Sequence, residues 1–395
     1  MTDYLPLIVF LMILAVLLRA ESALTVLYMI VGTFLIGFWW NKRAIRHIEF
    51  RREFDDHFFL GEKIDVDLTI KNQSLLPILW LEIHESIQAN LSAGKSINEV
   101  FSLGIYGEKH ITYALTALKR GYFKLGPFTA RTGDPLGLVK PGQVEFHDDP
   151  LIIYPQIIDL AVFTLPSRSP FGTIKHKNPI FEDPSRLLGK RDFSHGDSVR
   201  RIDWKATAST GKLQVKLYEA SIALDVLVLL DLHRESYEIN SLFDASELAI
   251  TAAASIAAWG NNKQQPVGLI TNGTDPLMDK RMPAPLLPHK GSGHFINILE
   301  ILARIQLGDE PSIENLLREN STNLSWGTTI ILISGGLKRN ILENLYKLQK
   351  RGLMPVVILT ANTPNYPELR SLSDFFSIPL YTASKTEHLK TLGMR

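Results

Sequence analysis

Two histidines of this 395-residue chain, each with carboxylates close by in the sequence, are candidates for catalysis. A histidine that is oriented by a carboxylate can act as a general base, which is the chemistry of many hydrolases. The two candidate groups are His195 with Asp192 and Asp197, and His233 with Asp231 and Glu235. The sequence contains no Gly-x-Ser-x-Gly elbow, no His-Glu-x-x-His zinc motif, no Walker-type phosphate loop and no cysteine. An isolated histidine near an acid is more often a surface or capping residue. We therefore expect a protein without enzymatic activity, with a hydrolase as the alternative.

The C-terminal part of the chain must position the second histidine. Residues 223–230 are almost continuously apolar, which is typical of a strand buried on both faces. Further strands are predicted at 267–271, 329–333, 356–359 and 378–381, and helices at 294–307, 339–351 and between a capping box at Asp244 and Glu247 and the end near Gly260. This order predicts a doubly wound, largely parallel sheet, whose sites lie beyond the carboxyl ends of the strands. The residues to inspect there are 231–236, 271–275 and 334–336.

A segment rich in charges of both signs precedes this sheet. We expect Asp197 to cap a short helix in which Val199, Ile202 and Ala206 share one face. One interpretation is an internal ion-pair network with Trp204 as a packed anchor, and the other is a surface that recognises a partner. The residues involved in either case are Asp197, Arg200, Arg201, Asp203, Trp204, Lys205, Lys216 and Glu219.

Residues 48–155 alternate apolar and polar side chains with period two. Ile64, Val66, Leu68 and Ile70 form one such run, and similar runs begin at Leu79 and Ile111. Turn signals separate the runs, and no helical pattern intervenes. The sequence therefore predicts a small antiparallel β-sandwich here.

The N-terminus is strongly apolar. Between residues 5 and 40 the only charged side chains are Arg19 and Glu21, so two apolar stretches at 5–18 and 23–40 predict a transmembrane helical hairpin. A cleaved signal peptide is the weaker alternative, because the chain opens with Met-Thr-Asp rather than a basic segment. The basic residues soon after the second stretch place the soluble part on the cytoplasmic side of the cell membrane. The formal net charge of +1 argues against a nucleic-acid partner.

Three motifs carry a resemblance to a known family. They are residues 120–127 (RGYFKLGP), residues 134–138 (DPLGL), and residues 196–208 (GDSVRRIDWKATA) continuing to 215–219 (VKLYE). Together they resemble the bacterial and archaeal family called domain of unknown function 58. The resemblance implies a membrane hairpin and a β domain joined to a domain similar to the von Willebrand factor A fold. It also implies partnership with MoxR-type AAA+ ATPases in chaperone-like maturation of other proteins.

The resemblance raises the question of a metal site. Domains of the von Willebrand type often hold Mg²⁺ through Asp-x-Ser-x-Ser, a threonine and a further aspartate. Here Asp231 is present, but His233 and Glu235 occupy the two serine positions, and Ser334 stands where an acidic ligand is expected. A bulky imidazole and a longer carboxylate do not replace two small hydroxyls around Mg²⁺. We therefore expect no cofactor. The alternative is an altered divalent-metal site on Asp231, His233 and Glu235, with Thr271 or Thr274 as a further ligand.

The sequence thus predicts four regions. They are a hairpin and basic segment at 1–47, the β-sandwich at 48–155, a connecting segment with the family motifs at 156–220, and an α/β domain similar to the von Willebrand factor A fold at 221–395. The predicted function is a non-enzymatic, membrane-anchored interaction platform. Its expected partners are the bilayer, a MoxR-type ATPase and client proteins. The alternative is a metal-dependent hydrolase or adhesion-type binding protein that uses the Asp231 loop. The oligomeric state is left open.

Overall fold

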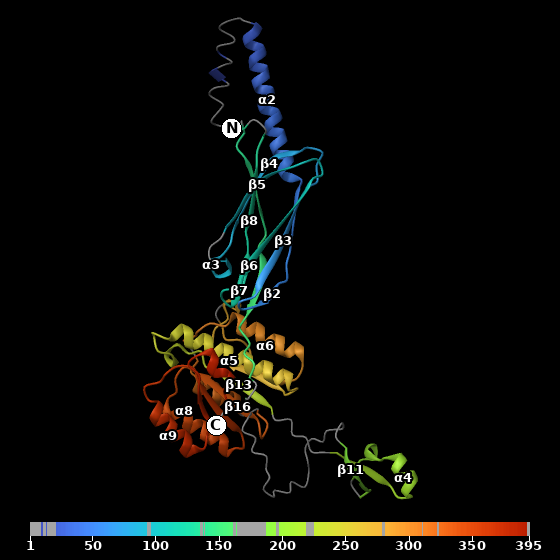
Figure 1. The fold of residues 1–395 in the computed structure, drawn as a ribbon, viewed down its shortest axis with the longest axis vertical. Coiled ribbons are helices and arrows are strands. Elements are labelled where there is room, and N and C mark those ends of the chain that lie inside the picture. The colour runs from blue at the N-terminus through green and yellow to red at the C-terminus, as the bar shows by residue number, and fades with distance from the viewer. Residues whose placement is uncertain are drawn as a thin grey trace. The chain divides into compact units, whose positions relative to one another are not determined.

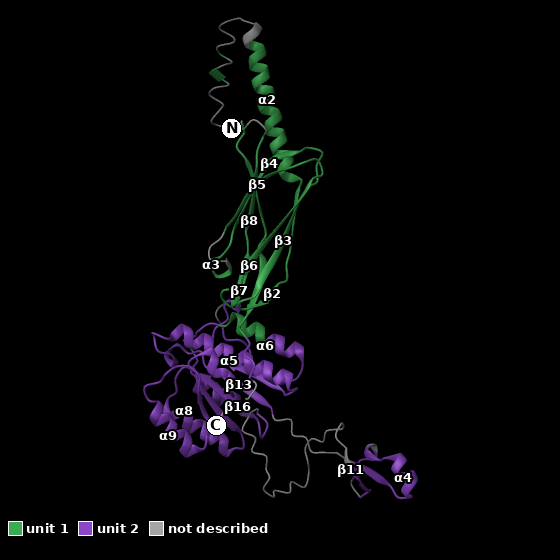
Figure 2. Ribbon diagram, viewed as in Figure 1, with its two compact units in different colours: residues 1–156, 299–305 green, residues 157–298, 306–395 purple. Residues whose placement is uncertain are grey.

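The chain divides into two compact units (Figure 2). The computed structural model describes residues 9–10, 13, 21–92, 96–134, 137, 139–160, 163, 187–194, 197–218, 225–278, 281–309, 311–321 and 324–392. The first unit comprises residues 1–156 and 299–305, and the second comprises residues 157–298 and 306–395.

The first unit begins with a long apolar helix, α2 (Glu21–Arg46). Its part Leu24–Arg46 is long and apolar enough to span a membrane, and only 17% of its most apolar stretch is buried. Leu242–Asn262 passes the same test of length and composition, but 72% of its corresponding stretch is buried inside the protein. The exposed apolar surface of α2 thus indicates association with a membrane. The first arm of the predicted hairpin, residues 5–18, lies almost entirely outside the described residues.

Helix α2 is longer than the predicted 23–40. It continues through the basic residues to Arg46, because its last turns pack on the β-strands that follow. Ala44 is buried there, and the Asn41 side chain donates to the backbone oxygen of Lys140 at 2.9 Å. Gly37 allows α2 to approach Asp134 closely, since a Cβ at this position would lie only 3.2 Å from the Cβ of Asp134.

Short strands make up the rest of this unit (Figure 1). They are β1 (Ile48–Glu53), β2 (His57–Phe59), β3 (Lys63–Asn72), β4 (Ile78–Ser86), β5 (Ser96–Leu103), β6 (Glu108–Thr116), β7 (Gly121–Leu125), β8 (Phe128–Thr132), β9 (Gly142–Phe146) and β10 (Asp149–Tyr154), with a short helix α3 (Ala89–Ser92) between β4 and β5. They form three sheets with the orders β1-β3-β6, β2-β10-β7 and β5-β4-β8-β9. All pairs are antiparallel except β10 with β2.

The predicted alternation holds in β3 and fails in part in β4. Ile64, Val66 and Ile70 are fully buried, as expected for the inward face. Leu79, predicted to face inward with Leu81, is 49% exposed, and Ile78 is buried instead. The pairing of β4 with β5 is irregular between Ile78 and Leu81, and this irregularity reverses the side-chain alternation at that point.

The second unit contains a six-stranded sheet. Its order is β15-β14-β13-β16-β17-β18, built from β13 (Val226–Leu230), β14 (Val267–Thr271), β15 (Leu286–His289), β16 (Thr329–Ser334), β17 (Met354–Leu359) and β18 (Leu380–Thr382). Helices α5 (Leu242–Asn262), α6 (Ser292–Arg304), α7 (Ile313–Asn320), α8 (Arg339–Lys350), α9 (Tyr366–Phe376) and α10 (Thr386–Lys390) connect or follow these strands, together with the 3-10 turns η2 (Arg234–Ser236) and η3 (Pro276–Met278). All neighbouring strands are parallel except β15, which pairs antiparallel with β14.

The predicted strands are all present, whereas one predicted helix start is wrong. Every residue of β13, β14 and β16 is buried, as their continuous apolar runs indicated. Helix α5 begins at Leu242 with Ser241 as its N-cap, so Asp244 lies in the first turn and does not cap the helix. Three helices were not predicted, namely α7, α9 and α10.

A small hairpin unit lies between residues 187 and 218. Strands β11 (Leu187–Asp192) and β12 (Gln214–Tyr218) pair antiparallel, and the chain between them forms a 3-10 turn η1 (Val199–Arg201) and a short helix α4 (Trp204–Thr210). An additional bridge joins Ile202 to Val215, and Asp203 N donates to Gln214 O at 2.8 Å. We call residues 187–218 the signature hairpin, because the longest family-like motif runs through it.

Candidate functional site

Three loops meet at the carboxyl edge of the six-stranded sheet, where the sequence placed its candidate site. Asp231 follows β13 directly, Asn272 follows β14, and Ser334 ends β16. The Asp231 carboxylate is fully buried and accepts four hydrogen bonds. Its Oδ1 accepts from the Asn272 side chain at 2.8 Å and from His233 N at 3.1 Å. Its Oδ2 accepts from the Ser236 hydroxyl at 2.7 Å and the Ser334 hydroxyl at 2.8 Å.

The backbone around Asp231 is held equally firmly. Leu232 N donates to Asn272 Oδ1 at 2.6 Å, and the Tyr237 hydroxyl donates to Asp231 O at 2.6 Å. Burial raises the pKa of Tyr237 well above the ordinary tyrosine value, and the negative charge of Asp231 raises it further. Gly335 is required for this closeness, because a Cβ there would lie 2.3 Å from the Tyr237 ring. The loops therefore form a rigid polar network around one carboxylate.

The predicted metal ligands do not assemble around Asp231. His233 contacts the carboxylate through its backbone N–H, while its ring Nδ1 accepts from Glu235 N at 3.3 Å. The exposed carboxylate of Glu235 lies 3.8 Å from Lys338, and the Thr271 hydroxyl accepts from Gly273 N at 3.1 Å. Among the described residues, no group of three or more His, Cys, Asp or Glu could hold a metal ion.

The polar network does not fit a divalent-metal site. Mg²⁺ needs several oxygens with lone pairs turned toward the ion. Here protein donors already occupy both oxygens of Asp231, and two of those donors are the nearby serine hydroxyls. We therefore derive no chemistry through a metal. Ser236 and Asn272 lie within the ranges that the sequence marked for inspection, although no role was predicted for either, and Tyr237 lies just outside them.

A cleft of about 310 Å³ opens beside this network. Its polar rim includes Glu235, Glu238, Glu314 and Lys338, and its floor includes the buried side chains of Leu337 and Ile341. Two of these carboxylates already have polar partners. Glu314 accepts from the Asn340 side chain at 2.6 Å, and Glu235 faces Lys338. The cleft offers binding surface, and Ser236 on its lining donates its hydroxyl to the buried carboxylate of Asp231.

The signature hairpin binds two of its three aspartates, Asp197 and Asp203, through cations of its own first strand. Asp197 accepts from the guanidinium of Arg191 at 2.6 and 2.7 Å and from Ser194 N at 2.8 Å. Asp203 accepts from Ala206 N at 3.1 Å and lies 3.0 Å from Lys190. Hydrogen bonds from Arg191 lower the pKa of Asp197, and the bond from Ala206 N, followed by the Lys190 contact, lowers the pKa of Asp203. Asp203, and not the predicted Asp197, is thus the N-cap of α4.

Several other side chains of the signature hairpin are exposed. Trp204, considered above as a packed anchor, is 65% exposed, and Val199, predicted to share the buried face, is also 65% exposed. Only Ile202 and Ala206 of the predicted apolar face are buried. Arg201 and Lys205 are exposed next to the tryptophan in sequence, and Lys216 is half-buried on β12.

Some predicted residues cannot be placed. His195 and Glu219 lie outside the described residues, and so does the side chain of Arg200, although its backbone belongs to η1. Of the first histidine group, Asp192 accepts from the Gln214 side chain and Asp197 pairs with Arg191.

Comparison with known proteins finds a family for the central part of the chain. Residues 189–362 match the family described as "Protein of unknown function DUF58". This region contains the signature hairpin and most of the six-stranded sheet, including the Asp231 network. It covers somewhat less than half of the chain.

One curated relative is similar over a longer stretch. It is called "Uncharacterized protein YeaD", comes from Bacillus subtilis strain 168, and is 22% identical over 230 residues. The match covers 55% of this chain and 58% of the relative, so the chain spans less than two thirds of the relative's length.

Solved structures resemble only a small part of the chain. The CARDB domain of a Pyrococcus furiosus protein is 16% identical over 27% of this chain and 86% of its own, with a TM-score of 0.20. Red sea bream transglutaminase is 11% identical over 27% of this chain and 15% of its own, with a TM-score of 0.19. Scores this low do not establish a shared fold.

Proposed function

We propose that this protein is a non-enzymatic, membrane-anchored platform that binds a cytoplasmic protein partner through the signature hairpin. One observation supports the proposal most. Trp204 is 65% exposed, and Arg201 and Lys205, which are close to it in the sequence, are exposed as well, while Asp197 and Asp203 are paired with Arg191 and Lys190. A large aromatic side chain among cations is the composition of binding hot spots.

The partner we propose is a MoxR-type AAA+ ATPase, acting with the platform on client proteins. The support is the family resemblance of the motifs in residues 120–138 and 196–219, together with the family match of residues 189–362. The exposed cations Arg201 and Lys205 favour an acidic surface on the partner. We further propose that the six-stranded sheet is a domain similar to the von Willebrand factor A fold, and that residues 5–40 form a transmembrane hairpin with the remainder in the cytoplasm.

Co-purification from native membranes tests this proposal. The full-length chain is solubilised in detergent, captured by a tag, and its bound proteins are quantified by mass spectrometry. We expect an AAA+ ATPase to be retained by the natural chain and lost from the double variant Trp204→Ala, Lys205→Glu. The matched control is Trp326→Ala with Lys385→Glu, because Trp326 is 66% exposed and Lys385 is also exposed. Equal retention by both variants would exclude the hairpin as the docking surface.

A further inference from the structure

Several exposed apolar side chains gather at one end of the β-strands of the first unit. Strand register identifies this end. Helix α2 runs directly into β1 at Ile48, which pairs with Asn72 at the end of β3. Lys71 of β3 pairs with Glu108 at the start of β6, and Ile78 at the start of β4 pairs with Leu103 at the end of β5. The β3–β4 loop (73–77) and the β5–β6 loop (104–107) therefore lie at the same end as α2. We call this end the helix-proximal rim.

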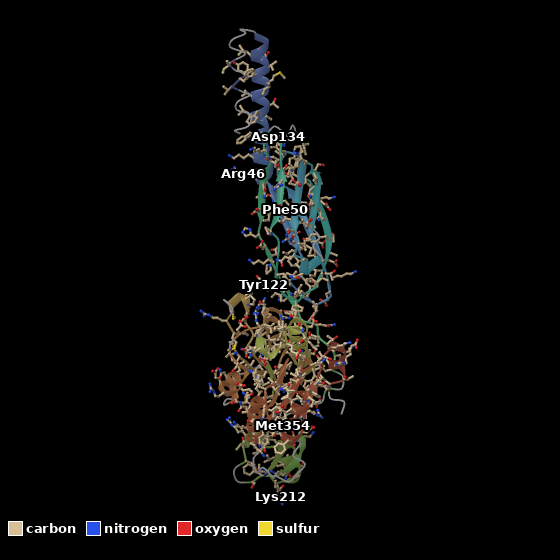
Figure 3. The ribbon with its side chains drawn as sticks, turned by 90° about the vertical axis from the view of Figure 1, so that its left-hand side faces the viewer. Arg46, Phe50, Tyr122, Asp134, Lys212 and Met354 are labelled. Carbon is tan, nitrogen blue, oxygen red and sulfur yellow. The ribbon has the colours of Figure 1, made fainter. Side chains whose placement is uncertain are left out.

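Hydrogen bonds join the two loops to each other and to the helix. Gln73 N donates to His47 O at 2.8 Å, directly after the last turn of α2. Tyr106 N donates to Ser74 O at 3.3 Å, and the buried Asn72 side chain donates to Gly104 O and Leu76 O, both at 2.8 Å. The loops are thus held in fixed positions next to the end of the helix. Figures 1 and 3 show this end of the strands at the base of α2, where Asp134 and Arg46 are labelled, while Tyr122 is labelled at the other end.

The rim exposes apolar side chains where a soluble surface usually carries polar ones. Leu75 is 70% exposed, Tyr106 59%, Ile105 56% and Leu79 49%. The sequence has no charged residue from Gln73 to Leu79 or from Gly104 to Gly107. Apolar side chains at two neighbouring loop tips are typical of a surface that contacts a partner or a membrane.

The length of α2 places the rim at the level of the lipid headgroups. A helix rises 1.5 Å per residue, so about twenty residues cross the hydrocarbon core. The predicted apolar span 23–40 ends at Trp40. The next residue, Asn41, is buried against protein and its side chain donates to Lys140 O. His47, where the first rim loop is attached, lies roughly 10 Å further along the helix, and the headgroup layer is roughly 5–8 Å thick. The two rim loops, 73–77 and 104–107, extend from the level of His47 back toward the start of α2 and can therefore reach this layer.

The charge around the rim agrees with this position. Lys42, Arg43 and Arg46 are exposed on the last turns of α2, and the Arg43 guanidinium lies 5.9 Å from the centre of the Trp39 ring. Cations beside an aromatic residue are common where proteins meet anionic lipid headgroups.

From this geometry we infer that the helix-proximal rim inserts Leu75, Ile105 and Tyr106 into the lipid–water interface, as a second membrane contact beside α2. The inference requires α2 to lie in a bilayer, and it is independent of which partner binds the signature hairpin. Insertion of the rim restrains the orientation of the β-strands relative to the membrane, because it adds a second contact at a distance from the membrane span.

Site-specific fluorescence tests the inference on the full-length protein, which contains no cysteine. Single variants Leu75→Cys and Tyr106→Cys are labelled with a nitrobenzoxadiazole dye and reconstituted in phosphatidylcholine–phosphatidylglycerol vesicles. The matched controls are Leu118→Cys, 53% exposed and at the other end of β6, and Val100→Cys, 65% exposed within β5. We expect the emission of both rim labels to shift to shorter wavelength and to be quenched by lipids brominated in the acyl chains. The control labels should do neither.

Two outcomes would overturn the inference. Rim labels with the same emission as the control labels would show that the rim is in water. A shift to shorter wavelength without quenching by brominated lipids would show that the rim is covered by protein, such as a second copy of this chain. Neither outcome would affect the co-purification test of the signature hairpin.

Discussion

The Asp231 carboxylate is the residue on which the carboxyl edge of the sheet depends most. Its four hydrogen-bond donors come from three different loops. In Asp231→Asn, an NH2 group replaces one carboxylate oxygen, so the two hydrogen bonds to that oxygen are lost or, where the donors are the serine hydroxyls, must reverse direction. We expect the free energy of unfolding to fall by about 2–3 kcal/mol. Urea denaturation of the solubilised protein measures this loss.

A surface aspartate provides the control for this substitution. Asp309 lies 3.1 Å from Arg234, and its side chain is 78% exposed. Because water screens such pairs, Asp309→Asn should change stability by less than about 1 kcal/mol. If the two variants were equally stable, the buried network would not be a structural feature of the protein.

We predict that the stability of the signature hairpin depends on pH through Asp197 and Asp203. The pKa values of Asp197 and Asp203 are lowered in the folded protein. Carboxylates with lowered folded pKa values contribute stability that is complete above the ordinary aspartate pKa and is lost as the pH falls through the folded value. We expect amide protection in residues 191–206, corrected for intrinsic exchange, to be constant from pH 7 to pH 5 and to fall toward pH 3.

Hydrogen exchange of the Asp197→Asn variant checks the cause. This variant should have reduced protection at pH 7 and a weaker dependence on acid, because one of the two titrating groups is gone. An unchanged acid profile would mean that the ion pairs with Arg191 and Lys190 do not hold the hairpin together.

At the residue scale, the sequence located the site but not its contacts. The three loops could be predicted because parallel strands end at one edge of a sheet. The role of Ser236 could not, since the 3-10 turn of residues 234–236 brings this serine to Asp231 in place of Glu235. The partner of Asp197 was also hidden, because Arg191 belongs to the preceding strand and only the paired hairpin brings it near.

Elements of the first unit are joined by one buried ion cluster. Arg52 of β1 lies 2.6 Å from Glu85 of β4 and 2.6 Å from Asp149 of β10, and the Tyr113 hydroxyl of β6 donates to Glu85 at 2.6 Å. The cluster therefore links strands of all three sheets. Burial and the neighbouring Glu85 raise the pKa of Tyr113, so that this hydroxyl remains a donor.

Removing one partner from this cluster should lower the stability of the protein more than removing two. Arg52→Met leaves the fully buried Glu85 without its cation and should lower stability by about 3–5 kcal/mol. The double variant Arg52→Met, Glu85→Met should recover a large part of that loss, because no uncompensated charge is left in the core. Urea denaturation of both variants tests this expectation. A double variant less stable than Arg52→Met would show that the ion pair itself is strongly favourable.

At the element scale, buried strands were easier to predict than short helices. A strand such as β16 is apolar throughout, which leaves little ambiguity. In α9, the apolar residues Tyr366, Leu369 and Leu372 have the spacing of one helix face, but Pro367 in the same stretch argues against a helix when only the sequence is considered. The proline lies in the first turn, where no backbone donor is needed. Helix α7 has only eight residues, too few for a periodic pattern to be decisive.

For the whole molecule, we predict the sidedness of the proposed membrane helix from the basic residues at its end. Lys42, Arg43 and Arg46 remain exposed at the end of α2, and such residues stay on the cytoplasmic side. The exposed loop residue Asn240 of the second unit should then also be cytoplasmic. The sequence predicts two spans, so both Thr2 and Asn240 should lie inside and Ser22, at the predicted turn, outside.

Single cysteines at these three positions separate the possible topologies, because the natural chain has none. In intact cells, a membrane-impermeant maleimide should label Ser22→Cys but neither Thr2→Cys nor Asn240→Cys, and it should label all three after permeabilisation. Labelling of Thr2→Cys in intact cells would show that the chain crosses the membrane once rather than as a hairpin, with the platform still in the cytoplasm. Labelling of Asn240→Cys in intact cells would place the signature hairpin on the outer side, where a cytoplasmic ATPase could not reach it.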